Sequence, residues 1–254
     1  MPTNGPQLAA PVPARNAQFP WNEFAAVDYC DHNYLKLRED DKEILELVSR
    51  WFAQEMGKRS AGDAIDVGAG PNLYPSLAML PHSRTMTLRE YSTSNVEFLR
   101  AQTADLPERW GPFWDVVSPG ARHGDLGKAR ALLAERVRVE QGSVFDLPHS
   151  SWDLGTMFFV AESISQDPAE FESAVGRFVR ALRPGSPFAA AFMEQSDGYD
   201  VAGVRFPATP VGRREVRACL GALSTDLKVE RVEMRPAPLR AGYTGMIVAV
   251  GRAL

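Results

Sequence analysis

The chain has 254 residues, of which 44% are hydrophobic and 24% are charged, and its formal net charge at pH 7 is −4. This composition is ordinary for a globular protein with a sizeable core. The acidic balance and the lack of a dense Lys/Arg block argue against a nucleic-acid binder, which needs positive charge opposite phosphates.

Several function classes are disfavoured by what the sequence lacks. No apolar run is long enough to cross a bilayer, and residues 1–16 lack the apolar segment of a signal peptide. Cys30 and Cys219 stand alone without the spacing of a zinc site, and the four histidines are scattered. We therefore expect a cytoplasmic protein, a monomer or weak homo-oligomer, with no metal and no nucleic-acid or membrane partner.

The chain divides into three parts by composition and pattern. Residues 1–19 are rich in Pro, Ala, Asn and Gln, which predicts a flexible segment. Residues 20–60 predict a helical cap, because 40–57 place apolar side chains at helical spacing and end at Gly57. Residues 61–254 predict one α/β domain.

From residue 61 onward, short strands alternate with helices. The expected strands span 64–67, 85–89, 136–141, 152–160 and 187–193, and the expected helices span 72–80, 95–104, 168–182 and 212–223. Residues 105–127 show no clear periodicity and predict a long irregular insertion. Strands 227–234 and 246–251 have no helix between them and predict an antiparallel hairpin at one sheet edge. The pattern predicts a Rossmann-like fold, a mostly parallel seven-stranded sheet with helices on both faces.

The strongest local signal lies in residues 64–71, where a buried strand runs into a Gly-Ala-Gly turn. Glycines let the backbone approach a ligand closely. A dinucleotide fold prefers a third glycine beside its diphosphate, and that position is Leu73 here. Asp66 inside the strand suits a cationic ligand end. S-Adenosylmethionine has such an end, because its methionine part carries an ammonium and a sulfonium.

A second acid follows at the end of the next expected strand. Glu90 lies about twenty residues after the glycine turn, where an acid accepts hydrogen bonds from ribose hydroxyl groups. NAD and S-adenosylmethionine both carry a ribose, so Glu90 does not distinguish between them. Asp146 and Asp153 flank the turn between the third and fourth strands, and the loop 142–144 is expected near the adenine.

Several of these segments together resemble one family, the small-molecule N-methyltransferases that act on nicotinamide, phenylethanolamine, indolethylamine and thioethers. The likeness runs from about Phe24 to the C-terminus. Tyr29 and Tyr34 resemble the paired tyrosines that cap that family's active site, and residues 66–74 are similar to its cofactor loop. The tail is similar as well, from the turn 183–185 into the last helix.

The resemblance implies the class I methyltransferase fold, with the cap of residues 20–60 over the active site and S-adenosylmethionine bound by the domain 61–254. S-Adenosylhomocysteine would be the product. The sequence departs from the family at Glu90, where animal members favour Asp, and at Ser143, where the family places Asp. The Ala, Arg and Pro content indicates a bacterial member. The implied cofactor-binding residues are Tyr29, Tyr34, Asp66, Gly68, Ala69, Gly70, Tyr74, Glu90, Tyr91, Asn95, Ser143, Val144, Thr156 and Ala161.

Methyl transfer is an in-line displacement, for which a protein aligns the nucleophile and excludes water. Glu194 falls where the family keeps a substrate-facing carboxylate, and we expect it to hold an acceptor amine. Glu162 follows the fourth strand, at the sheet edge where α/β folds bind ligands, and is the second candidate. Tyr34 completes the expected catalytic set. Phe24 and Tyr199, together with the two acids, form the expected substrate-binding set.

The expected activity is methyl transfer to a small-molecule acceptor, with an amine or N-heterocycle nitrogen favoured. Three alternatives stay open: O- or C-methylation of a natural-product intermediate, an NAD-dependent oxidoreductase, and a non-catalytic protein that binds S-adenosylmethionine. Leu73 and the C-terminal hairpin argue against the oxidoreductase. Tyr34 and Glu194 argue against a non-catalytic protein.

Overall fold

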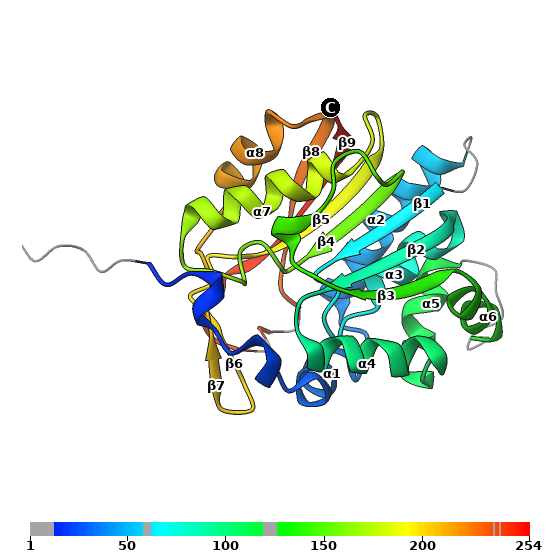
Figure 1. Ribbon diagram of the computed structural model, residues 1–254, viewed down its shortest axis with the longest axis horizontal. Helices are drawn as coiled ribbons and strands as arrows, with labels where there is room; N and C mark the ends of the chain where they lie inside the picture. Colours follow the sequence, from blue (N-terminus) through cyan, green and yellow to red (C-terminus); the bar gives the residue numbers. More distant parts are fainter. Residues whose placement is uncertain (1–12, 58–61, 119–125, 236, 239) are drawn as a thin grey trace, which may run out of the picture.

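The main feature of the computed structural model is a seven-stranded sheet in the order β3-β2-β1-β4-β5-β9-β8 (Figure 1). The structure describes residues 13–57, 62–118, 126–235, 237–238 and 240–254. The sheet strands are β1 (Gly62–Val67), β2 (Ser83–Glu90), β3 (Val137–Gln141), β4 (Leu154–Phe158), β5 (Pro187–Glu194), β8 (Ser224–Val232) and β9 (Gly245–Ala253). β1 to β5 run parallel, whereas β9 is antiparallel to both β5 and β8. The predicted fold, including the antiparallel C-terminal pair, is confirmed.

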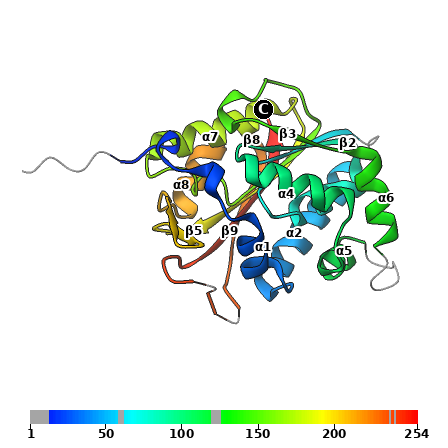
Figure 2. The same cartoon turned by 60° about the horizontal axis from the view of Figure 1, so that its bottom comes forward.

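Helices cover both faces of this sheet (Figures 1 and 2). They are α1 (Ala26–Tyr34), α2 (Glu39–Met56), α3 (Tyr74–Met79), α4 (Thr93–Ala104), α5 (Gly111–Val117), α6 (Gly127–Arg136), α7 (Pro168–Ala181) and α8 (Arg213–Gly221). Buried side chains of α2, α3, α5 and α6 share one hydrophobic cluster, and those of α7 and α8 share another. No helix in the part of the chain that the structure describes is both long and apolar enough to cross a membrane.

The apolar sequence of β5 follows from its place between these two layers. Ala189 and Ala191 belong to the first cluster, whereas Phe188, Ala190 and Phe192 belong to the second. Successive side chains of a strand point to opposite faces, so both sets are buried. From Pro187 to Met193 the strand therefore has no position at which a polar side chain would reach water, and only Glu194 at its end is partly exposed.

Helix α7 shows why the periodic segments were predictable. Its buried residues recur at helical spacing on one face, and Asp167 caps its N-terminus by accepting a hydrogen bond from Ala169 N at 3.0 Å. Pro168 occupies the first turn, where its missing N–H leaves no hydrogen bond unmade. The helix ends before the turn at Gly185, whose φ is 78°.

The predicted irregular insertion over residues 105–127 is partly helical. A 3₁₀ turn, η4 (Glu108–Trp110), leads into α5, and residues 119–125 lie outside the described residues. Trp110, Phe113 and Trp114 are buried in the same cluster as α2 and α3. Their spacing of three and four residues is helical, but Gly111 and Pro112 at the first turn concealed it. Helix α6 was also not predicted.

The N-terminal segment differs from the flexible segment predicted over 1–19. Residues 1–12 lie outside the described residues. Residues 13–25, here called the N-terminal strap, are hydrogen-bonded to α7 at one end and to the start of α4 at the other. Asn16 N donates to Glu170 Oε2 at 2.8 Å, and Thr93 N donates to Asn22 Oδ1 at 3.0 Å. The strap contains two 3₁₀ turns, η1 (Asn16–Gln18) and η2 (Trp21–Glu23). Composition alone does not show such contacts, because their partners are far away in sequence.

The two helices of the expected cap over residues 20–60 have different positions. Helix α1 carries the paired tyrosines, whereas α2 packs with its apolar face into the core beneath the sheet. Beside α1 lies a small hairpin of β6 (Tyr199–Val201) and β7 (Val204–Phe206). Its turn residues Ala202 and Gly203 have φ values of 47° and 84°, which is the twist that two-residue hairpin turns require.

Candidate active site

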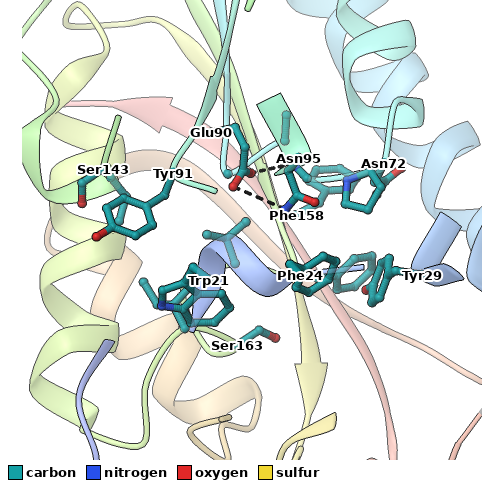
Figure 3. Close-up of a pocket in the computed structure, with 18 of the residues that line it drawn as sticks. Trp21, Phe24, Tyr29, Asn72, Glu90, Tyr91, Asn95, Ser143, Phe158 and Ser163 are labelled. Atoms are coloured by element: carbon teal, nitrogen blue, oxygen red, sulfur yellow. Dashed lines mark hydrogen bonds between the residues drawn. The ribbon is translucent and has the colours of Figure 1, made fainter. Parts of the chain in front are cut away.

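A cavity lies at the carboxyl ends of β1, β2 and β4, beneath the strap and α1 (Figure 3). The order β2-β1-β4 places the strand-order reversal between β1 and β4, and open α/β sheets bind ligands at this point. The cavity encloses about 810 Å³, part of it open to solvent. Twelve of the predicted site residues line it: Phe24, Tyr29, Tyr34, Gly68, Ala69, Gly70, Glu90, Tyr91, Asn95, Ser143, Val144 and Tyr199.

The glycine turn forms one wall of this cavity. Gly68 and Gly70 have φ values of 65° and 54°, a region that favours glycine. A Cβ at Gly68 would lie 2.6 Å from Val160 Cγ1, so this position has no space for a side chain. The turn therefore presents bare backbone to the cavity, as the close approach of a ligand requires.

Glu90 and Asn95 form the polar centre of the cavity (Figure 3). Glu90 Oε2 accepts a hydrogen bond from Gly70 N, and Oε1 accepts one from Ser92 N, both at 2.8 Å. Asn95 Nδ2 donates to Glu90 Oε1 at 3.4 Å, while Asn95 Oδ1 is buried without a partner among the described residues. A carboxylate oxygen has further lone pairs, so these two side chains can accept bonds from two adjacent hydroxyl groups. A ribose supplies such a pair of donors.

The charge of the cavity selects against phosphates. Its one charged lining residue is Glu90, and none of the described residues that line it is Lys, Arg or His. A dinucleotide diphosphate would have no cation to bind, whereas a ligand with ammonium and sulfonium groups meets a favourable carboxylate. Among the described residues, no three His, Cys, Asp or Glu side chains gather in a way that could hold a metal ion.

Asp66 does not line the cavity, although the sequence predicted a direct ligand contact. It lies under the glycine turn, where its carboxylate accepts hydrogen bonds from Ser76 Oγ at 2.5 Å and Thr156 Oγ1 at 2.8 Å. Burial raises the pKa of Asp66 to about 7, against the opposing effect of these two bonds. The acid joins β1 to β4 and α3 and so positions the turn. Asp66 is still close enough to the cavity to interact electrostatically with Glu90, whose negative charge is one of the causes that raise the pKa of Asp66.

Three other expected cofactor-binding residues also lie behind the cavity wall. Tyr74 is fully buried and stacks on Phe113, with ring centroids 5.8 Å apart. The hydroxyl group of Thr156 donates its hydrogen bond to Asp66. Ala161 is buried in the hydrophobic cluster that contains α7 and α8. These residues support the site rather than lining it.

Aromatic rings enclose the cavity on the side of the strap. Tyr29 packs edge-on against both Tyr34 and Tyr199, with centroid distances of 6.1 and 6.3 Å. Phe24 lies 5.2 Å from Tyr29 (Figure 3). At the opposite end Tyr91 lines the cavity with 49% of its surface exposed, which leaves a ring face free for a flat heterocycle such as adenine. Such rings also favour a cationic sulfonium.

The two expected acceptor carboxylates have different surroundings, and neither lines the cavity directly. Glu162 is fully buried beside the lining residue Ser163, and its Oε1 accepts a bond from Met193 N at 2.9 Å. Glu162 Oε2 is buried with no partner in the described structure. Burial raises the pKa of this carboxyl to about 7.

Glu194 lies at the end of β5 and is engaged elsewhere. Its Oε2 accepts bonds from Arg231 Nε at 2.6 Å and from Thr244 Oγ1 at 2.9 Å. Both partners come from the C-terminal strand pair, so this carboxylate joins β5 to β8 and the start of β9. Its pairing takes it away from the role of acceptor ligand that the sequence predicted.

Several lining residues were not predicted. Asn16 and Trp21 come from the strap, Asn72 follows the glycine turn, and five more lie at the end of β4 or just after it: Phe158, Phe159, Val160, Ser163 and Ile164. The β4 segment could have been found, because it ends at the same sheet edge as the glycine turn. The strap residues carry no sequence signal of their own.

Three buried carboxyls make the stability of the protein depend on pH. Burial raises the pKa of Asp41, Asp66 and Glu162 to about 7 in each case, well above their unfolded values of about 4. The folded state therefore keeps protons that the unfolded chain has lost. This stabilisation is complete below about pH 4 and is lost as pH rises through about 7. We expect the Tm of the unliganded protein to fall between pH 5 and pH 8.

The variant Asp41→Asn should show a smaller fall in Tm over this range, because one of the three titrating groups is removed. Thermal unfolding followed by circular dichroism at both pH values measures this. Glu43→Gln, an exposed carboxyl on the same helix, is the matched control and should retain the wild-type pH dependence. An Asp41→Asn variant with that same dependence would contradict the assignment of Asp41.

The comparisons with known proteins agree with this geometry. A model of the NNMT/PNMT/TEMT family matches residues 15–252. The phenylethanolamine N-methyltransferase of Bos taurus is 26% identical over an alignment of 268 positions, gaps included, that covers 95% of this chain and 89% of that protein. The enzyme of Macaca mulatta is 26% identical over 216 residues, covering 78% and 74%.

Among solved structures, the 1,6-didemethyltoxoflavin-N1-methyltransferase of Burkholderia thailandensis has a similar fold. That structure contains 1,6-didemethyltoxoflavin and S-adenosylhomocysteine. Its TM-score is 0.56 at 18% identity, over 97% of this chain and 93% of that one.

The fold and the site define a class I methyltransferase that uses S-adenosylmethionine. The chain belongs to the NNMT/PNMT/TEMT family. The predicted family, fold, enzyme class and cofactor are thereby confirmed.

Proposed function

We propose that this methyltransferase transfers the methyl group to an amine or N-heterocycle nitrogen of a small molecule, and that Glu162 binds this nitrogen. The observation that carries the proposal is Glu162 Oε2, a buried acceptor with no partner in the described structure beside the cavity-lining Ser163. A buried polar atom without a partner is costly, and an N–H donor would satisfy it. The names of the relatives support the choice of nitrogen, since they are N-methyltransferases.

The cofactor is expected in the half of the cavity formed by the glycine turn and the end of β2. Glu90 and Asn95 accept bonds from the ribose hydroxyl groups, and Tyr91 and Val144 enclose the adenine. Ser143 stands where the family resemblance implies an acid, and its hydroxyl already accepts a bond from Phe145 N at 3.1 Å. We propose that Tyr29 and Tyr34 cover the methionine end, with Asp66 acting on it only through its charge.

When bound, S-adenosylmethionine supplies a methyl carbon on a sulfonium, so that the acceptor nitrogen forms the new C–N bond while the C–S bond breaks and sulfur keeps its electron pair. The surrounding rings of Phe24, Tyr29 and Tyr199 exclude water and orient the acceptor. A neutral amine becomes a cation on methylation and then loses a proton. An acceptor that arrives as an ammonium must first lose a proton, because its nitrogen otherwise has no lone pair for the new bond. With a pKa of about 7, the Glu162 carboxylate can pair with that ammonium and take its proton, or receive the proton released after methylation of a neutral amine.

Glu194 is not part of this proposal, because Arg231 and Thr244 occupy its carboxylate. O- or C-methylation would instead require a group that removes a phenol or carbon proton. The rings that enclose the cavity offer only phenols, and burial raises the pKa of Tyr29, Tyr34 and Tyr199 above the ordinary value. Glu162 is a carboxyl beside the cavity that can also take a proton, so the preference for nitrogen rests on the relatives, which are N-methyltransferases.

We further propose a cytoplasmic bacterial enzyme, a monomer or weak homo-oligomer that does not bind nucleic acid. The net charge of −4 supports the last point. Cys30 and Cys219 are both free thiols, which is usual in a reducing compartment.

The test is a screen of primary amines, pyridines and phenols with S-adenosylmethionine labelled at its methyl group, read by mass spectrometry. We expect label on nitrogen and none on phenol oxygen. Label found only on oxygen or carbon would reject nitrogen as the acceptor atom.

A further inference from the structure

A second cavity lies on the other side of two of the rings that enclose the first. Tyr29 and Tyr199 line both cavities, so these side chains form the partition between them. The second cavity encloses about 1100 Å³, including space open to solvent, between α1, the β6–β7 hairpin and residues 240–242. An acceptor would have to reach past these two rings to extend from the first cavity into this one.

Arg240 is held in a defined position in the second cavity. Its guanidinium lies over the ring of Tyr199 at 5.3 Å and over that of Tyr243 at 5.1 Å. Its Nη1 donates to Gly198 O at 2.6 Å. Two cation–π contacts and one hydrogen bond restrict the side chain, so little conformational entropy is lost when it binds a ligand.

Arg240 differs from the neighbouring Arg205 in having no carboxylate partner among the described residues. Arg205 lines the same cavity and pairs with Asp200 at 2.9 Å and Asp197 at 3.4 Å. Arg240 makes no ion pair with any residue that the structure describes. The remaining charged or titratable lining groups are Asp28 and His32 on α1. Arg205 engages two of the three aspartates, and Asp28 makes no ion pair with Arg240, so Arg240 is a lining cation without a carboxylate partner among the described residues.

Arg240 and Glu162 act on the same partition. The charges of both residues contribute to the pKa of Tyr29 and of Tyr199, after the larger effect of burial. The positive charge of Arg240 also lowers the pKa of Glu162, in opposition to burial. A cation and an anion therefore both lie near this pair of rings, which lines the two cavities.

We propose that Arg240 binds a carboxylate of the methyl acceptor, which is therefore an elongated molecule with its amine at one end, at Glu162, and its carboxylate at the other end, in the second cavity. The placement of the amine rests on the proposed function, whereas the carboxylate site rests on Arg240. Guanidinium is suited to this ligand, because its planar fork matches the two oxygens of a carboxylate. The rings of Tyr29 and Tyr199 lie between the two ends.

The experiment compares matched probes whose amine and carboxylate lie at opposite ends of a ring with the same amines in which a methyl group replaces the carboxylate: 4-(aminomethyl)benzoic acid with 4-methylbenzylamine, and 4-(2-aminoethyl)benzoic acid with 2-(4-methylphenyl)ethylamine. Binding to the complex with S-adenosylhomocysteine is measured by calorimetry, and turnover is measured with labelled cofactor. We expect the wild-type protein to prefer the carboxylate-bearing member of at least one pair about 10- to 100-fold. Arg240→Gln should abolish that preference, and Arg240→Lys should retain part of it. Arg50→Gln, which removes an exposed arginine from α2, should leave the preference intact.

The outcomes separate this inference from the proposed function. Methylation of the plain amines, with no preference for a carboxylate, would overturn the role of Arg240 and leave the function standing. Carboxylate binding that depends on Arg240 without nitrogen methylation would support the site and contradict the function. An equal loss of both members of a pair in Arg240→Gln would show that the arginine only holds the loop, and no binding of any carboxylate probe would overturn the inference.

Discussion

Replacing Glu162 with Gln is expected to lower kcat/KM for an amine acceptor about 100-fold, because the acceptor loses a charged hydrogen-bond partner and a proton acceptor. The wild-type enzyme should also lose activity as pH falls below about 7, since burial raises the pKa of Glu162 to about 7 and its protonated form cannot pair with an ammonium. The Gln variant should lack this limb of the pH profile. Affinity for S-adenosylhomocysteine should stay at the wild-type value.

The comparison with Glu194→Gln decides between the two carboxylates. Glu194 is paired with Arg231, so we expect its substitution to affect stability more than turnover. Glu172→Gln, an exposed change on α7, serves as the control for loss of a negative charge. If Glu194→Gln lowered kcat/KM with an altered pH profile while Glu162→Gln retained wild-type kinetics, the roles of the two acids would be reversed.

Replacing Glu90 with Ala is expected to raise the Kd for S-adenosylhomocysteine about 100-fold or more. Two charged hydrogen bonds to the ribose would be lost, and each is worth about 1.5–3 kcal/mol. The N–H groups of Gly70 and Ser92 would also lose their acceptor, so the glycine turn itself should loosen. Isothermal titration calorimetry measures the affinity directly.

Because Glu90→Ala can disturb the turn, a second variant is informative. Glu90→Gln keeps one carbonyl acceptor and should fall between the wild type and the Ala variant. Glu97→Ala, an exposed change on α4, should bind as the wild type does. Wild-type affinity in a folded Glu90→Ala protein would mean that the acid at the end of β2 does not contact the ribose.

These predictions share one electrostatic basis. The site gathers Asp66, Glu90 and Glu162 at or beside a cavity without a lining cation among the described residues, so their burial is unfavourable until a positive ligand arrives. A sulfonium cofactor supplies that charge. The raised pKa values of these acids therefore reflect buried carboxylates that a cationic ligand would stabilise.

The elements that form the sheet were predictable because their signals are local. The apolar run of β5 and the stripe of α7 follow from burial of one strand between two layers and of one helix face. The positions of the glycine turn and Glu90 at the cavity were predictable because each lies at a strand end. Helix α5 was missed, since its apolar spacing begins at a Gly-Pro pair that resembles a loop.

The sequence by itself therefore determined the alternation of strands and helices, the glycine turn and the acid that follows β2, because each depends on neighbours in the chain. Only the tertiary structure decided which carboxylates lie at or beside the cavity and which are paired elsewhere. Asp66 turns to Ser76 and Thr156, and Glu194 is paired with Arg231, 37 residues further along the chain. Glu162 keeps a buried oxygen without a described partner. All three lie in or just after strands of the same sheet, and packing of distant elements selected among them.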